Sequence, residues 1–426
     1  MQAVVLAAGA ASRFWPLGED RHKSCFELMG RPLVAWTLES LQRAGIGEAI
    51  VVQRPGRDVE ASLQGHALDL DVRTVVQAEP RGMGDALLAA RERLHEPFLL
   101  VHAHQVDAGR WLAAMQRRRD ETDASVVLAG RPTDRPSQYG MLAFNGDRVS
   151  GIVEKPGPED APSDIRALGI YWLTPDFLEV LDGTAEHEYA FEDALDRHCK
   201  THEARAVVET EPSPSLKYPW DLFELNRRLM DRRLQADRAA SAWISPSAHV
   251  EGDVVIGENA KVFEYAVVKG PCYIGDDCVV GTHALVRDYS DLEPGTVIGA
   301  HAEVARCLFQ RETSTHSGYF GDSIFDREAR AGAGTVTANV TVHRGEVKST
   351  VNGERVRTGR TSLGAVVGRD TQLGINVSTM PGVLIGSWAF IGPGTVVSEN
   401  VPSETRYLVK QEVTEKQMRS GIKGAR

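Results

Sequence analysis

The chain has 426 residues, of which 42% are hydrophobic and 25% are charged, and this composition is typical of a folded globular protein. This length exceeds what one hydrophobic core usually supports, so we expect two domains. The formal net charge of -11 argues against nucleic acid as the main partner, because binding to a phosphate backbone requires a basic surface.

The start of the chain carries no recognisable targeting segment. Met1 leads directly into the apolar run 3–8, without the basic region or the cleavage site of a signal peptide. No apolar run approaches the ~20 residues that a membrane-spanning helix requires. The sequence therefore predicts a cytoplasmic protein with no membrane partner. The cysteines show neither a Cys-x-x-Cys pair nor zinc-site spacing, so we expect them to be reduced and structural.

Apolar strand-like runs alternate with amphipathic helical stretches through the first half of the chain. The expected strands cover 3–8, 49–53, 98–101 and 125–129, and the expected helices cover 33–44, 84–94 and 109–119. This alternation indicates βαβ units and a mainly parallel, Rossmann-like sheet. We assign residues 1–230 to this α/β domain. Residues 221–240 predict a long charged helix, whose end at 231–243 links the domain to the second half.

An aliphatic residue recurs at every sixth position in the second half. The series is Ile244, Val250, Ile256, Val262, Val268, Ile274, Val280, Val286, Leu292, Ile298 and Val304. Neither a helix nor an alternating strand has this period, whereas hexapeptide repeats build a β-helix in which each repeat forms one side of a triangular coil. We therefore predict a left-handed parallel β-helix over residues 244–402. Small residues four positions after each aliphatic, including Cys272 and Cys278, are expected to pack inside the corners.

The repeat is interrupted twice. Its register breaks after Val304, which predicts that residues 310–317 leave the coil as a loop. A second irregular stretch covers 343–361, and regular spacing then returns from Val367. Loops on a rigid scaffold can be shaped freely, so we expect function at these interruptions. Residues 403–426 lack the repeat and form a basic C-terminal tail.

The first strand runs into a turn of small residues followed by a base, Gly9-Ala10-Ala11-Ser12-Arg13. Such a turn lets backbone N–H groups approach phosphates, and Arg13 and Lys23 add positive charge. The turn belongs to a series of segments, namely LAAGAASRFWPL, HKSCFELMGRPL, Gln77 with EPRGMGDAL, Tyr139-Gly140 and Glu154-Lys155-Pro156. The series resembles, in order, the signature of the sugar-1-phosphate nucleotidyltransferase family.

This resemblance implies roles for particular residues of the first domain. A nucleoside triphosphate would be held by Gly9, Arg13 and Lys23, of which the last two are the catalytic candidates. The nucleobase would be read by Gln77 and Gly82. The sugar 1-phosphate would be bound by Gly140, Glu154 and Lys155.

The sequence departs from the family at the two aspartates that bind Mg²⁺ in its members. The first position lies in His102-Ala103-His104-Gln105, with His104 at the place of the aspartate, and the second falls near Ser215. Mg²⁺ prefers carboxylate oxygen, so the metal ligands of this domain stay unassigned. The spacing does not require Asp107 or Asp221 to replace them. Two hypotheses remain open here: nucleotidyl transfer, and binding of a nucleotide sugar without making one.

A second group of motifs lies where the repeat resumes. It contains His316-Ser317-Gly318-Tyr319-Phe320-Gly321-Asp322-Ser323, then Gly332-Ala333-Gly334-Thr335 and Asn339, then Gly374-Ile375-Asn376-Val377-Ser378. Transfer of an acetyl group from a thioester to an amine needs a base for the amine proton and donors for the oxyanion. A histidine on a loop beside glycine-rich coils suits both needs.

These motifs resemble the acetyltransferase half of the bifunctional sugar-1-phosphate nucleotidyltransferase/amino-sugar acetyltransferases, particularly the archaeal type. By this resemblance His316 would be the general base. The sugar phosphate would be contacted by Arg287, Tyr319 and Asn339. The acetyl-CoA channel would be lined by Ala333, Ser378 and Gly392.

We therefore expect a multifunctional transferase of sugar-nucleotide biosynthesis. It would acetylate an amino-sugar 1-phosphate with acetyl-CoA, and its first domain would couple a sugar 1-phosphate to a nucleotide, with Mg²⁺ as the family's metal. Because the resembling β-helices bind the coenzyme between subunits, the resemblance implies a homotrimer. Two alternatives remain: a regulatory or scaffolding protein whose first domain senses nucleotide sugars, and a nucleotidyltransferase whose β-helix serves only for oligomerisation.

Overall fold

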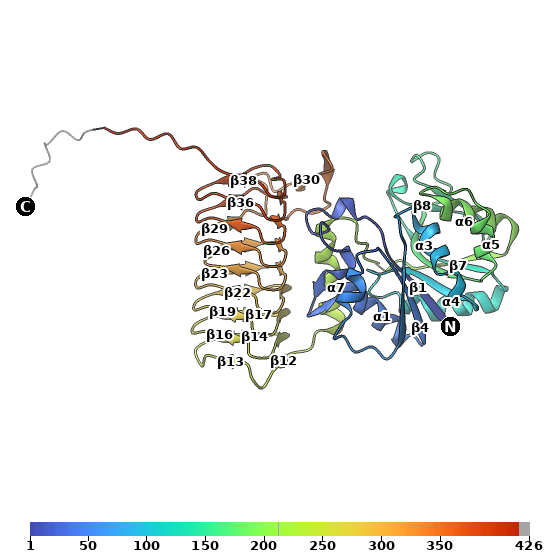
Figure 1. The fold of residues 1–426 in the computed structure, drawn as a ribbon, viewed down its shortest axis with the longest axis horizontal. Coiled ribbons are helices and arrows are strands. Elements are labelled where there is room, and N and C mark those ends of the chain that lie inside the picture. The colour runs from blue at the N-terminus through green and yellow to red at the C-terminus, as the bar shows by residue number, and fades with distance from the viewer. Residues whose placement is uncertain (212, 417–426) are drawn as a thin grey trace, which may run out of the picture.

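The computed structural model describes residues 1–211 and 213–416, which form an α/β domain and a triangular column of short strands (Figure 1). Residues 417–426, the end of the expected basic tail, lie outside the described residues. None of the helices in the described part has the length and apolarity that crossing a bilayer requires.

The α/β domain is built on a mixed nine-stranded sheet, as the alternating pattern predicts. Its main strand order is β11-β7-β10-β6-β1-β4-β5, and the hairpin β8–β9 pairs with β10. The strands are β1 Gln2–Ala7, β4 Glu48–Gln53, β5 Asp71–Val76, β6 Phe98–His102, β7 Val126–Pro132, β8 Gly140–Asn145, β9 Arg148–Glu154, β10 Ile165–Leu173 and β11 Ala204–Val208. Strand β1 is parallel to β4 and β6, whereas β10 is antiparallel to β6 and β7.

Helices cover both faces of this sheet. They are α1 Leu33–Arg43, α2 Asp58–Ser62, α3 Met83–Ala89, α4 Gly109–Thr122, α5 Phe177–Asp182, α6 Ala190–Thr201 and α7 Leu222–Arg233. Side chains of α3, α5 and α6 share one apolar core with the sheet, and side chains of α1 and α4 share another. Successive residues of a strand point to opposite faces, so a continuous apolar strand such as β1 serves both cores.

The second half is a parallel β-helix of three sheets, as the six-residue period predicts. The first sheet contains β12 Asp237–Arg238, β15 Val254–Ile256, β18 Cys272–Ile274, β21 Ser290–Leu292, β24 Leu308–Phe309, β27 Ile324–Phe325, β32 Val366–Val367 and β35 Leu384–Ile385. The second contains β13 Trp243–Ile244, β16 Lys261–Val262, β19 Val279–Val280, β22 Val297–Ile298, β25 Ser314–Thr315, β28 Arg330–Ala331, β33 Gln372–Leu373, β36 Phe390–Ile391 and β38 Arg406–Tyr407. The third contains β14 His249–Glu251, β17 Val267–Lys269, β20 Leu285–Arg287, β23 Ala302–Ala305, β26 Gly318–Gly321, β29 Thr335–Thr337, β34 Ser378–Thr379 and β37 Val396–Val397.

The aliphatic residues of the repeat form the core of the column. From Ile256 to Val304 they are fully or almost fully buried, and the small corner residues Cys272 and Cys278 are buried with them. Each coil stacks its aliphatic residue on the one eighteen residues earlier, as Val286 and Val304 show. One side chain per hexapeptide therefore suffices to build a continuous core.

The prediction of a loop at 310–317 is wrong, because this stretch stays in the coil and contains β25. Val304 pairs with Phe320, sixteen residues on, so the coil here is shorter than its neighbours rather than expanded. A missing residue breaks a six-residue period as effectively as an inserted loop does. The real excursion is the stretch 343–361, which contains the hairpin of β30 Lys348–Val351 and β31 Glu354–Arg357.

The connection between the halves is shorter than expected. Helix α7 ends at Arg233, and β12 at Asp237–Arg238 already pairs with β15, so the coil begins before residue 244. At the other end, β38 pairs with β36 beyond residue 402.

The first sheet of the column packs against the α/β domain. Apolar side chains from both halves form one buried cluster, which includes Phe14, Phe223, Leu308, Ile324 and Val351. A buried ion pair between Arg21 and Asp326, with 2.5 Å between nitrogen and oxygen, crosses the same interface. The hairpin β30–β31 contributes to this cluster, so the excursion helps to join the halves (Figure 1).

Candidate functional site

A cavity of about 900 Å³ lies at the carboxyl ends of β1 and β6. In open α/β sheets this edge is where ligands bind. The cavity brings together every residue that the sequence motifs of the first domain single out, namely Gly9, Arg13, Lys23, Gln77, Gly82, Gly140, Glu154 and Lys155. Segments far apart in the sequence therefore form one site.

The part of the cavity around Arg13 and Lys23 is positively charged. Arg13 lies in a short 3-10 helix that follows the small-residue turn, and Lys23 begins a second one. The Lys23 ammonium donates to the carbonyl of Leu216 at 2.7 Å. Burial, together with the nearby Arg13, lowers the pKa of Lys23 to about 8. A phosphate anion bound here would stabilise both cations.

Two glycines shape the wall of the cavity. Gly82 has a φ of 102°, and a Cβ added to it would lie 2.6 Å from the carbonyl oxygen of Glu188. A Cβ on Gly140 would lie 2.8 Å from a carboxylate oxygen of Glu154. The amide of Gln77 donates to Gly82 O at 3.1 Å and to Asp85 at 2.7 Å, which fixes its orientation. The backbone is thus shaped for close approach to a ligand.

His104, which the resemblance puts at the place of the first metal-binding aspartate, lies beside a second imidazole, that of His102. His102 and His104 both line the cavity, and their rings stack with centroids 5.5 Å apart. Burial and the nearby Lys23 lower the pKa of His102 to about 4 and that of His104 well below its usual value. Both rings are therefore neutral at pH 7. Ser215 lines the cavity as well and brings no charge.

The two aspartates that could have replaced the missing ligands are used elsewhere. Asp107 accepts a hydrogen bond from Arg228 at 2.6 Å, and Asp221 accepts the backbone N–H groups of Lys217 and Tyr218 before α7. Among the described residues, no aspartate lines the cavity. Since Mg²⁺ requires hard oxygen ligands in near-octahedral geometry, the residues at this place do not fit it.

Several cavity-lining residues lie outside the motifs. Arg166, on β10, stacks over the ring of Tyr139 at 4.1 Å, and burial lowers its pKa. Lys217 adds a further cation. Burial raises the pKa of Glu192 to about 7, so this carboxyl group is partly protonated at neutral pH. Their sequence positions carry no periodic or motif signal, so only the folded arrangement identifies them.

His316 stands at a corner of the β-helix where neighbouring coils carry glycine. It follows β25, is exposed, and donates its backbone N–H to Ala331 O at 2.9 Å. The equivalent corner positions, linked by the same backbone hydrogen bonds, are Gly299 below it and Gly332, Gly374 and Gly392 above it. The imidazole therefore projects from an edge where the neighbouring coils, below and above, carry glycine.

The other residues implied for acetyl-CoA follow this edge. Ala333 comes directly after Gly332, Ser378 begins the neighbouring strand β34, and Gly392 belongs to the edge itself. Coils in such a column lie ~4.8 Å apart, so Gly392 is roughly 14 Å from His316 along the axis. An extended ligand could lie along this line.

The residues implied for the sugar phosphate lie on the adjoining third sheet. A Cβ on Gly321 would lie 2.6 Å from the Tyr319 hydroxyl and 2.7 Å from Asn339 Nδ2, so these two side chains meet. Asn339 donates to Asp322 at 2.6 Å, and Asp322 also accepts two hydrogen bonds from Arg306. Arg287 lies lower on the same sheet and pairs with Glu303 at 2.7 Å. Sequence reasoning assigned no role to Asp322, which joins this network.

The sequence of the chain matches two known families. The family described as "Nucleotidyl transferase" matches residues 2–217, and "Bacterial transferase hexapeptide (six repeats)" matches residues 253–288 and 364–399. The first match covers the α/β domain and its cavity, and the second covers coils of the β-helix.

Two curated relatives match the chain over nearly its full length, and a third matches about half of it. A protein of Sulfurisphaera tokodaii named bifunctional sugar-1-phosphate nucleotidylyltransferase/acetyltransferase is 28% identical over 94% of this chain and 98% of its own. The bifunctional protein GlmU of Methanococcus maripaludis is 29% identical over 97% of this chain and 98% of its own. A UTP–glucose-1-phosphate uridylyltransferase of Streptococcus pyogenes is 28% identical over 47% of this chain and 79% of its own.

Proposed function

Because the chain belongs to the nucleotidyl transferase family, we propose that it is a two-site transferase of sugar-nucleotide biosynthesis. Its α/β cavity joins a sugar 1-phosphate to a nucleotide, and its β-helix transfers an acetyl group from acetyl-CoA to an amino-sugar 1-phosphate. The names of the full-length relatives in Sulfurisphaera and Methanococcus support both activities.

One observation carries the first activity: the motif residues of the α/β domain all line a single cavity at the carboxyl edge of the sheet. In nucleotidyl transfer, a phosphate oxygen of the sugar 1-phosphate attacks the α-phosphorus of the nucleoside triphosphate, and pyrophosphate leaves. Arg13 and Lys23 would bind the triphosphate and offset the charge that builds up on it. Gln77 and Gly82 would hold the base, and Gly140, Glu154 and Lys155 the sugar phosphate.

A second function of this domain is favoured by the stacked imidazoles of His102 and His104. Neutral rings do not supply the carboxylate oxygens that hold Mg²⁺. A cavity of this kind can bind a nucleotide sugar and report its concentration to the β-helix. Pyrophosphate release separates the two: transfer requires that Arg13→Ala abolish it, whereas a sensor binds nucleotide sugar but releases no pyrophosphate.

In the β-helix, we propose that His316 takes the proton of the acceptor amine. The amine nitrogen attacks the thioester carbonyl of acetyl-CoA, the carbon–sulfur bond breaks, and the coenzyme leaves as its thiol once it has gained a proton. The ring of His316 is exposed at a corner where the neighbouring coils carry glycine, and this position supports the role. Ala333, Ser378 and Gly392 would line the coenzyme, while Arg287, Tyr319 and Asn339 would hold the sugar phosphate.

We further propose that the acetyltransferase site is completed by a second copy in a homotrimer. The edge that carries His316 is open in one chain, and exposed apolar side chains lie beside it on the coils above His316. These are Val336, Ile375, Met380 and Val396, which are 38%, 54%, 42% and 58% exposed. A partner subunit would bury them. Since acetyl-CoA and nucleoside triphosphates are cytoplasmic metabolites, we place the enzyme in the cytoplasm.

A further inference from the structure

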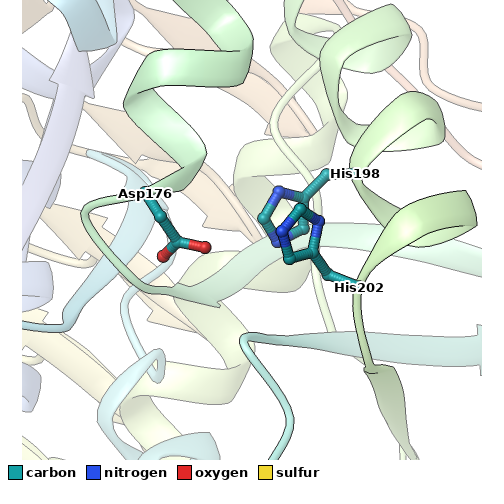
Figure 2. Close-up of side chains that lie close together, drawn as sticks. All are labelled: Asp176, His198 and His202. Carbon is teal, nitrogen blue, oxygen red and sulfur yellow. The ribbon is translucent and has the colours of Figure 1, made fainter.

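A carboxylate and two imidazoles meet where α5 begins and α6 ends (Figure 2). Asp176 directly precedes α5, His198 lies in the last turn of α6, and His202 follows that helix. One ligand atom of each residue lies within 4.8 Å of those of the other two. None of the three lines the large cavity. This cluster therefore has no part in the activities proposed above.

The hydrogen bonds of His198 fix the proton of its ring. Its Nε2 lies 2.8 Å from the hydroxyl oxygen of Ser125, and that hydroxyl donates its proton to the carbonyl of Glu203 at 3.3 Å. This arrangement assigns the ring proton to Nε2, because the Ser125 hydroxyl then accepts from Nε2–H, and it leaves Nδ1 with a lone pair. The His198 side chain is fully buried, and Nδ1 has no hydrogen-bond partner. A buried acceptor without a donor is unfavourable unless something positive binds it.

The neighbours of this lone pair are acceptors too. Asp176 and His202 are exposed, and the ring of His202 stacks on that of His198 with centroids 4.1 Å apart. His202 uses Nδ1 in a 2.9 Å contact with the hydroxyl of Thr201, which leaves its Nε2 available. The nearby cation Arg148 donates to the carbonyls of Cys199 and His202 and pairs with Glu203. The cluster thus combines a carboxylate with two nitrogen lone pairs.

We propose that Asp176, His198 and His202 bind a divalent transition-metal cation of the zinc class. Imidazole nitrogen with one carboxylate oxygen suits Zn²⁺, whereas Mg²⁺ and Ca²⁺ prefer oxygen alone. The hydrogen bond from His198 Nε2 to Ser125 is the outer partner that metal-binding histidines usually have. The cation would join α5 to α6, whose connecting segment lines the large cavity at Glu186 and Tyr189.

The proposal is tested by titrating the untagged full-length protein with Co²⁺, which reports nitrogen and oxygen ligation by visible absorption. We expect one saturable site per chain, weakened at least about tenfold in His202→Ala and in Asp176→Asn. Both side chains are exposed, so the variants should fold. His249→Ala is the matched control, because His249 is an exposed histidine that pairs with Glu251 at 3.0 Å elsewhere. Zn²⁺ should also raise the melting temperature of the wild type but not of His202→Ala.

Three results would overturn the proposal. These are no saturable Co²⁺ binding by the wild type, binding that is unchanged in His202→Ala and Asp176→Asn, and binding that is lost only in His104→Ala. The last result would place the cation at the imidazoles of the large cavity instead.

Discussion

His102 and His104 stack with 5.5 Å between ring centroids at the carboxyl end of β6. Burial beside Lys23 keeps both rings neutral, and Ser215 faces the same cavity. The cavity thus contains the cations Arg13 and Lys23, whereas no aspartate lines it in the described part of the chain.

Introducing carboxylates at positions 104 and 215 tests whether their absence limits the rate of pyrophosphate release. In His104→Asp/Ser215→Asp, two oxygen ligands would replace an imidazole and a hydroxyl, so we expect Mg²⁺-dependent pyrophosphate release at least about tenfold above the wild-type rate. The assay follows pyrophosphate release from a nucleoside triphosphate and a sugar 1-phosphate. Equal rates in the two proteins would show that the imidazoles do not limit the reaction.

If Lys23 contacts the phosphates as proposed, the affinity for a nucleoside triphosphate should depend on pH. Its pKa, lowered to about 8 by burial and Arg13, means that the free protein loses this charge as the pH rises through 8. We expect the affinity for a nucleoside triphosphate, measured by calorimetry, to fall between pH 7 and pH 9. Lys23→Arg should bind equally well at both values, because a guanidinium stays protonated. A flat profile in the wild type would mean that Lys23 does not contact the phosphates.

Gly82→Ala should destabilise the fold and weaken base binding. The residue has a φ of 102°, and the added Cβ would lie 2.6 Å from Glu188 O. We expect a loss of roughly 1–3 kcal/mol in the free energy of unfolding, measured with denaturant. Gly9→Ala is the control, since a Cβ there meets nothing within 4 Å. Equal stability of the two variants would contradict the backbone constraint at Gly82.

A charge on the exposed third sheet should disrupt the proposed trimer. Val396 is 58% exposed beside the glycine edge, so Val396→Asp would place a carboxylate in the contact between copies. Light scattering should report a trimer for the wild type and a smaller species for the variant. Val208→Asp, at a 44% exposed position in the α/β domain, should remain trimeric. A wild-type monomer would exclude a shared acetyltransferase site.

The sequence predicts the parts of the fold that rest on periodic patterns. The α/β alternation and the hexapeptide core are confirmed, because each pattern follows directly from which side chains a strand or coil buries. The prediction of a loop at 310–317 is wrong because a deletion interrupts the six-residue period in the same way as an insertion does. The end of α7 at Arg233 could not be found, since neither Gly nor Pro follows it directly.

The candidate sites were predictable only where a motif is continuous in sequence. Gly9 and Arg13 are close in the chain, and His316 lies among the closely spaced motifs that resemble the acetyltransferase family. Arg166 reaches the large cavity from β10, and Asp176 meets His198 only because α5 packs on α6. Contacts of this kind depend on tertiary packing, which cannot be predicted from a local sequence pattern.

We propose above that the β-helix carries an acetyltransferase with His316 as its base. The most direct measurement is acetyl-CoA consumption over a panel of amino-sugar 1-phosphates, with His316→Ala compared with His301→Ala. His301 is an exposed histidine at the same corner one coil below, stacked on His283 at 5.1 Å. We predict a loss of at least about a hundredfold for His316→Ala and near-wild-type activity for His301→Ala. Equal activity of His316→Ala and the wild type would contradict the claim.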